Sequence, residues 1–169
     1  MPQKNDPLTV VHEELKAAMK KEVQLMREIL TNMHQEEVAL LLNDKGSWNH
    51  VMQQRYYLVE RLSDFRAARV KATSKLEKIV CQDSHLSCPS LEQLLPSESE
   101  ESCEILSLSD QIVALAERMN SQNFRNTGLV HQIEHQLSIP HETRHYPMQH
   151  QEELRAKKKV SIATYQIKK

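Results

Sequence analysis

The chain has 169 residues, and its formal net charge of −1 argues against a general nucleic-acid binder, which needs a basic surplus. Hydrophobic residues make up 39% of the chain without an apolar run of about 18 residues, so we expect no membrane insertion. Only two glycines and two phenylalanines occur, while straight-chain helix formers are abundant, which favours a single all-α domain. A polar N-terminus and an odd number of cysteines, three, predict a cytoplasmic protein with free thiols.

The first helix is predicted over about residues 7–43, where Asp6 can cap the free amides and Pro7 suits the first helical position. A heptad seam of apolar residues runs along it: Met19, Met26, Met33 and Leu40. A second series lies four residues later: Val23, Leu30 and the polar break Glu37. Such a seam favours methionines in a core, although methionine also forms adaptable binding surfaces. Four more residues widen the seam and predict contact with more than one helix: Leu25, Ile29, Val38 and Leu41.

A short connection over residues 43–47 ends the first helix and begins the second, which is predicted over about residues 47–81. Gly46 can take the left-handed conformation that closes a helix, and Ser47 can cap the next one. So short a connection predicts that the two helices are antiparallel neighbours.

The second helix has a seam whose gaps alternate between four and three residues: Val51, Arg55, Leu58, Leu62, Phe65, Arg69, Ala72, Leu76 and Ile79. Arg55 and Arg69 interrupt this apolar seam, so each should either pair with an acid or extend its charged end to solvent. Glu37 of the first helix is one possible partner.

Residues 82–103 contain prolines and a Ser/Glu run, which predict an exposed, mobile linker. Within it, Ser90 and Gln93 fit a capping box for one short helical turn. The third long helix is predicted over about residues 104–138, with an apolar seam that turns polar at Gln122 and Asn126.

Residues 140–169 change in character and predict a flexible basic tail, which includes the lysines 157–159. The sequence therefore predicts an all-α fold. Residues 1–139 should form an elongated, antiparallel, coiled-coil-like bundle of three long helices, and the flexible C-terminal tail should follow it.

Two weak patterns could indicate a metal site. The first is the H-x-x-E-H pattern of one class of zinc peptidases, formed by His131, Glu134 and His135. The second is an irregular set near the linker: Cys81, His85 and Cys88, with Cys103 beyond. No acidic ligand follows the first pattern convincingly, so we expect solvated histidines and free thiols instead. Without a phosphate loop or nucleophile elbow, the sequence predicts no enzyme, no catalytic residue, no cofactor and no metal.

The third helix carries Asn123, Asn126, Gly128 and Leu129 in a pattern that resembles the last helix of the FlgN family of flagellar type III export chaperones. Residues 33–40 resemble that family's L-x-x-E-x-x-A-L stretch, and residues 58–69 resemble its L-x-x-L-x-x-x-R pattern. The resemblance extends over roughly residues 20–137.

This resemblance implies a chaperone that binds the C-terminal helical segment of a secreted client protein, prevents its premature assembly and escorts it to the export gate. In the flagellar members the clients are hook–filament junction proteins. The expected partners are therefore the client and proteins of the export gate or the ATPase complex. A tyrosine in the tail is implicated in contact with the gate, and here the matching position is Tyr165.

The residues themselves suggest where such a client would bind. Asn123 and Asn126 break the apolar seam, which indicates a helix face that is not fully committed to its own core. Apolar residues then continue towards the tail and could accept an amphipathic helix: Leu129, Val130, Ile133 and Leu137. The alternatives are a structural coiled-coil adaptor or stalk component of a secretion apparatus and, less favoured, a zinc hydrolase.

Overall fold

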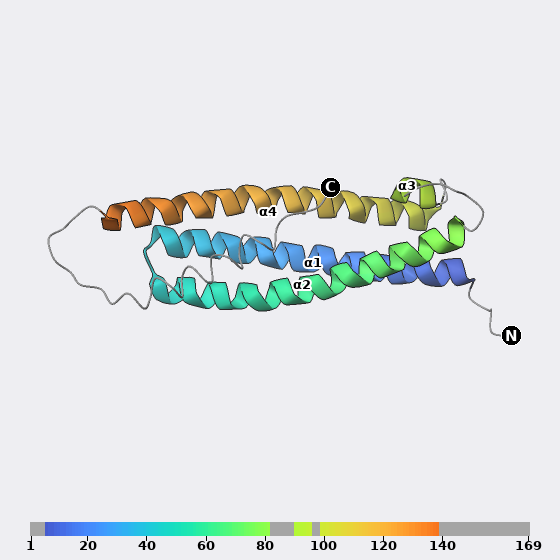
Figure 1. Cartoon of the computed structure of the whole chain (residues 1–169), viewed down its shortest axis with the longest axis horizontal. Coiled ribbons are helices and arrows are strands. Elements are labelled where there is room, and N and C mark those ends of the chain that lie inside the picture. The colour runs from blue at the N-terminus through green and yellow to red at the C-terminus, as the bar shows by residue number, and fades with distance from the viewer. Residues whose placement is uncertain (1–5, 82–89, 96–98, 139–169) are drawn as a thin grey trace. The chain divides into compact units, whose positions relative to one another are not determined.

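The computed structural model describes residues 6–81, 90–95 and 99–138, all in or next to helices (Figure 1). The long helices are α1 (Pro7–Leu41), α2 (Lys45–Val80) and α4 (Glu100–Ser138), and α3 (Leu91–Leu94) is a single short turn. They confirm the predicted all-α bundle of three long helices. The chain divides into two compact units, residues 1–126 and 127–169, and α4 continues from the first into the second. None of the described helices is apolar over a stretch long enough to cross a membrane.

Helix α1 begins as the sequence predicts. Asp6 is its N-cap and accepts a hydrogen bond from the Leu8 amide at 3.4 Å, and Pro7 occupies the first turn. Proline suits this position because its missing N–H would have no helical partner there.

The connection between α1 and α2 is built differently from the prediction. Asn43, not Gly46, takes the left-handed conformation, with φ of 53°, and no described glycine has positive φ. Asp44 caps α2 in place of Ser47, because its carboxylate accepts hydrogen bonds from the amides of Gly46 and Ser47 at 3.0 and 3.1 Å. Asparagine tolerates the left-handed region better than most residues, so it can close α1 two residues before the predicted end.

The cap at Asp44 should make stability depend on pH. Hydrogen bonds from the hydroxyl and then the amide of Ser47 hold the pKa of Asp44 below its ordinary value. The carboxylate therefore stabilises the fold above the unfolded-state pKa, and this stabilisation is lost as pH falls through the lower folded-state pKa. We expect the advantage of wild type over Asp44→Asn in urea unfolding to shrink between about pH 5 and about pH 2. A constant difference across this range would contradict a role for the charge.

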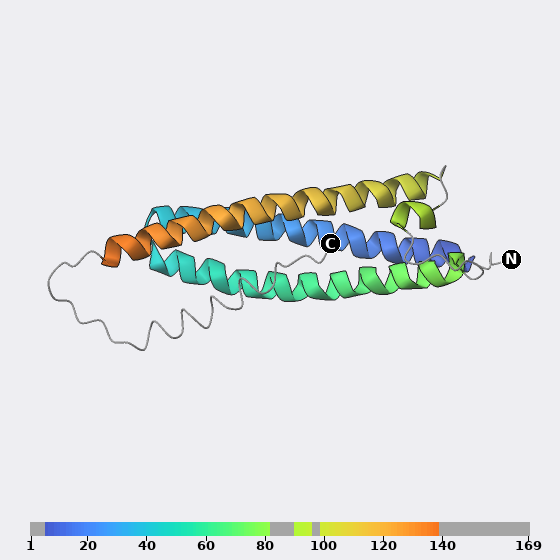
Figure 2. The same ribbon diagram turned by 45° about the horizontal axis from the view of Figure 1, so that its top comes forward.

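Helices α1 and α2 run antiparallel and lie side by side (Figure 2). Their cross-links run in opposite order along the two helices: Glu14 with Lys75, Glu22 with Arg69, and Glu36 with Arg55. The seam methionines of α1 are buried, which confirms their prediction as core: Met19, Met26 and Met33. Of the residues predicted to widen the seam, Leu25 and Ile29 are buried, but Val38 and Leu41 are 55% and 65% exposed.

Within the first unit, α4 runs parallel to α1. Lys20 pairs with Glu104 at 2.5 Å, and further along both helices Arg27 donates to Gln111 at 2.8 Å. Helix α4 begins at Glu100, earlier than predicted, because Ser99 caps it by accepting the Ser102 amide at 3.0 Å. The Ser/Glu run therefore belongs partly to this helix, since serine suits the cap and glutamates suit the first turn.

Helix α3 is the short turn predicted within the linker. The Gln93 side chain accepts a hydrogen bond from the Ser90 amide at 3.0 Å, as in a capping box. Leu94 and Leu95 are buried, and α3 contacts α2. Residues 82–89 of the linker and the predicted tail, 140–169, lie outside the described residues.

Candidate functional site

A buried polar layer crosses the first unit and joins its three long helices. Its members are Asn32 and Glu36 of α1, Arg55 of α2, and Gln122 and Asn126 of α4. Each of these side chains is less than 10% exposed, so each must find its hydrogen bonds inside the protein.

Arg55 is the cation of the polar layer. Its Nη1 donates to Glu36 Oε2 at 2.6 Å and its Nε donates to Asn32 Oδ1 at 2.8 Å, while Asn32 Nδ2 donates to the Val51 carbonyl at 3.0 Å. Of the two outcomes expected for Arg55, pairing with an acid or extending its charge to solvent, the structure shows pairing, and the partner is Glu36 rather than Glu37. The other seam arginine, Arg69, pairs with the fully buried Glu22 at 2.6 Å.

Helix α4 closes the layer through its two polar seam residues. Asn126 Nδ2 donates to the same Glu36 oxygen at 2.6 Å and to the Met33 carbonyl at 2.8 Å. Gln122 Nε2 donates to Asn126 Oδ1 at 2.9 Å and to Glu37 at 2.6 Å. Because each bond requires a particular register of α4 on α1, this layer fixes how the two helices are aligned.

The residues predicted to bind a client differ in burial and in the unit to which they belong. Asn126 is buried and engaged in the polar layer, whereas Asn123 is only partly buried. Leu129, Val130 and Ile133 belong to α4 in the second unit, and each is partly buried.

Helical spacing puts Leu129, Val130 and Ile133 on the face that Asn126 occupies one turn earlier, while His131 and Glu134 are exposed. This part of α4 is therefore amphipathic. Leu137 lies in α4 but its side chain is outside the described residues, as is Tyr165.

Several exposed apolar side chains lie in the first unit, where the sequence analysis did not predict a surface. On α1 they are Val38, Leu41 and Leu42, on α2 they are Tyr56 and Tyr57, and on α4 they include Val113 and Phe124. A signal for α1 was present: helical spacing places Val38 and Leu42 with the polar Thr31 and Gln35 rather than with Met33.

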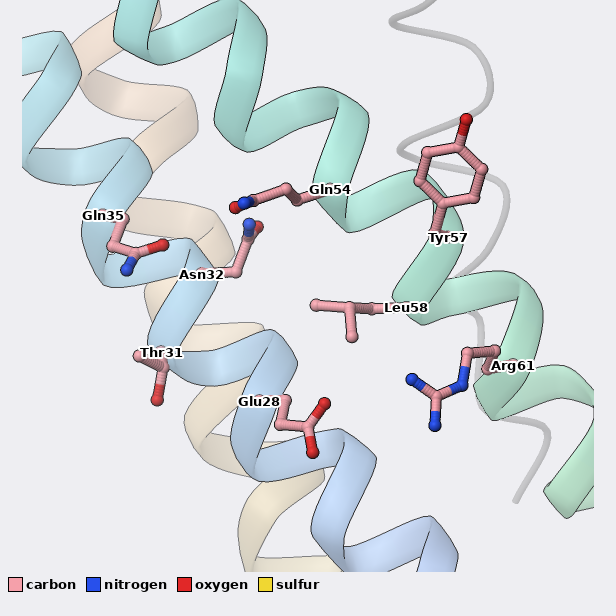
Figure 3. Close-up of a pocket in the computed structure, with 8 residues that line it drawn as sticks. All are labelled: Glu28, Thr31, Asn32, Gln35, Gln54, Tyr57, Leu58 and Arg61. Carbon is pink, nitrogen blue, oxygen red and sulfur yellow. The ribbon is translucent and has the colours of Figure 1, made fainter.

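A shallow hollow open to solvent lies between α1 and α2 (Figure 3). Its walls come from both helices: Glu28, Thr31, Asn32 and Gln35 of α1, and Gln54, Tyr57, Leu58 and Arg61 of α2. Most of these side chains are polar. The hollow is too open to enclose a small molecule, because sites for such ligands bury most of the ligand surface.

The two metal patterns are not assembled into sites within the described ranges. His131 Nδ1 lies 3.4 Å from Glu134 Oε2, and both side chains are exposed. No three His, Cys, Asp or Glu side chains of the described residues gather as metal ligands would. Cys81 and Cys103 form no disulfide within the described residues, and His85 and Cys88 lie outside them.

Comparisons with protein-family models, with curated proteins and with solved structures found no match to this chain.

Proposed function

We propose that this chain is a type III export chaperone that binds the C-terminal helical segment of a secreted client and keeps it from assembling prematurely. The observation that supports this best is the amphipathic end of α4, where Leu129, Val130 and Ile133 continue the core seam but remain partly exposed. The resemblance of the last helix to the FlgN family points to the same stretch.

The polar layer suits such a role because it separates two parts of α4. Up to Asn126, the helix is held in one register by hydrogen bonds to Met33 and Glu36. Beyond Asn126, the apolar face of α4 can pack against an amphipathic helix from a client. The client helix would contact this face through apolar residues spaced three and four positions apart. Covering the client's own assembly helix in this way would prevent its polymerisation.

The proposal includes delivery of the client. Tyr165 would contact the export gate, as the family resemblance implies. Client binding and delivery would then use different parts of the chain.

The test is affinity capture from the native cytosol with the full chain, followed by purification of each captured protein for direct binding. Replacing Leu129 and Ile133 together by Asp should weaken binding of the client at least about 100-fold, because the two anchor residues together should contribute about 3 kcal/mol or more. Val113→Asp is the matched control, since Val113 is an exposed apolar residue of the same helix. Circular dichroism should show all variants helical.

A client supporting the proposal must be a type III secreted protein, bind in a fixed stoichiometry and lose binding when its C-terminal segment is removed. Equal binding by wild type and the double variant would place the client site elsewhere. Recovery of only this chain or of membrane-machine components would favour the structural adaptor. That adaptor would need a surface other than the methionine seam, which is buried within one chain.

A further inference from the structure

We propose that the hollow between α1 and α2 docks an amphipathic helix of a partner protein, and that a carboxylate beside the apolar face of that helix pairs with Arg61. This site uses other residues than Leu129, Val130 and Ile133 of α4, which we propose bind the client. It does not depend on the proposed export function. It would give the protein a second binding surface.

The hollow uses a face of α1 that α4 leaves free. Helix α4 is bonded to α1 through Arg27, Met33 and Glu37, among others. Helical spacing turns Glu28 and Gln35 to a different side, and Figure 3 shows α4 lying behind α1, away from the hollow. In helical bundles, a further helix commonly packs into the groove between two antiparallel helices.

Apolar surface in and beside the hollow can bury the hydrophobic face of a helix. Tyr57 is 66% exposed and Leu58 is partly buried, and both line the hollow. Val38 and Leu42 are 55% and 73% exposed and extend the same face of α1 towards the connection with α2. Exposed tyrosine next to arginine is the composition typical of binding hot spots.

The charge of Arg61 identifies the chemistry of the partner. The exposed Arg61 side chain has neither a carboxylate within ion-pair distance nor a hydrogen-bond partner among the described residues. Glu28 faces it across the hollow, but its carboxylate accepts a hydrogen bond from Gln24 at 3.0 Å instead. A carboxylate on the incoming helix would supply the missing charge, and the planar guanidinium can bind it through two parallel hydrogen bonds.

The experiment uses the full chain and a panel of fluorescent, hydrocarbon-stapled 18-residue helices with one leucine face. One glutamate is scanned around that face, and each peptide has a partner with lysine at the same position. We expect at least one glutamate peptide to bind saturably in fluorescence anisotropy, and at least about tenfold tighter than its lysine partner. Arg61→Glu should reverse this preference, which a general loss of folding could not do.

Matched variants locate the site. Tyr57→Ala should weaken binding about tenfold, whereas Val70→Ala, which truncates an exposed apolar residue of the same helix outside the hollow, should not. Arg118→Glu, at an exposed arginine of α4 that does not line the hollow, should leave the preference unchanged. The Leu129→Asp and Ile133→Asp pair should also leave it unchanged, which separates this proposal from client binding. No binding by any peptide, or an unchanged preference in Arg61→Glu, would overturn the proposal. So would a wild-type dimer in light scattering that Tyr57→Ala dissociates, since a second copy would then occupy the hollow.

Discussion

Replacing Arg55 by Met should lower the free energy of unfolding by about 3–5 kcal/mol, because it leaves the charge of Glu36 buried without its cation. Both side chains are 8% exposed, and their ion pair is 2.6 Å long. The substitution also removes the donor to Asn32, whose oxygen would then have no partner among the described residues. Urea unfolding followed by circular dichroism and by the fluorescence of Trp48, the one tryptophan in the sequence, measures the loss.

The double variant Arg55→Met with Glu36→Leu is the control for this prediction. Removing both charges takes away the unpaired carboxylate, so we expect the double variant to regain a large part of the stability that Arg55→Met loses. The recovery should be incomplete, because Asn126 also donates to Glu36 and would lose that acceptor. If the two substitutions simply add, Arg55 and Glu36 are not coupled and the polar layer does not act as one unit.

The sequence predicts those features of the fold that follow from the local spacing of apolar residues. The heptad seams gave three long helices, and the short connection gave an antiparallel pair, because both follow from local spacing. Helix ends were less predictable where two residues compete for one role. Asp44 and Ser47 can both cap a helix, and the aspartate is the cap because its carboxylate accepts both amides.

Pairing between helices is where the sequence alone fell short. Periodicity says that Arg55 faces inward, but the choice between Glu36 and Glu37 depends on how far α2 slides along α1. Neighbouring residues differ by about 100° around a helix, so Glu36 and Glu37 reach different partners, and Glu36 binds both Arg55 of α2 and Asn126 of α4. Glu37 accordingly accepts a hydrogen bond from Gln122 of α4.

The candidate client site was also predicted only in part, because the sequence does not show which residues of other helices a polar seam residue contacts. Asn126 stood out as a polar break, which suggested an uncommitted face. In the structure its amide is fully used by Glu36, Met33 and Gln122, so the break belongs to the core of the first unit. An asparagine in a seam fits either role until its partners are known. The exposed Tyr57 and Arg61 had no periodic signal, because exposed aromatic and charged residues do not repeat along a seam.

Ile29→Ala should lower the free energy of unfolding by about 2–5 kcal/mol, whereas Val38→Ala on the same helix should change it by about 0.5 kcal/mol or less. Both residues were predicted from the sequence to widen the methionine seam of α1. In the structure Ile29 has no exposed surface and Val38 is 55% exposed. Truncating Ile29 removes buried apolar contacts and leaves a cavity, while truncating Val38 removes atoms that are mostly in water.

Urea unfolding of the two single variants and the double variant tests this difference. The residues lie nine positions, or about 14 Å, apart along one helix, so the double variant should lose the sum of the two single effects. A loss of more than about 2 kcal/mol for Val38→Ala would mean that Val38 is covered in solution. Concentration-dependent unfolding would then identify a second copy as the cover, because association stabilises by mass action, and concentration-independent unfolding would assign the cover to the chain itself.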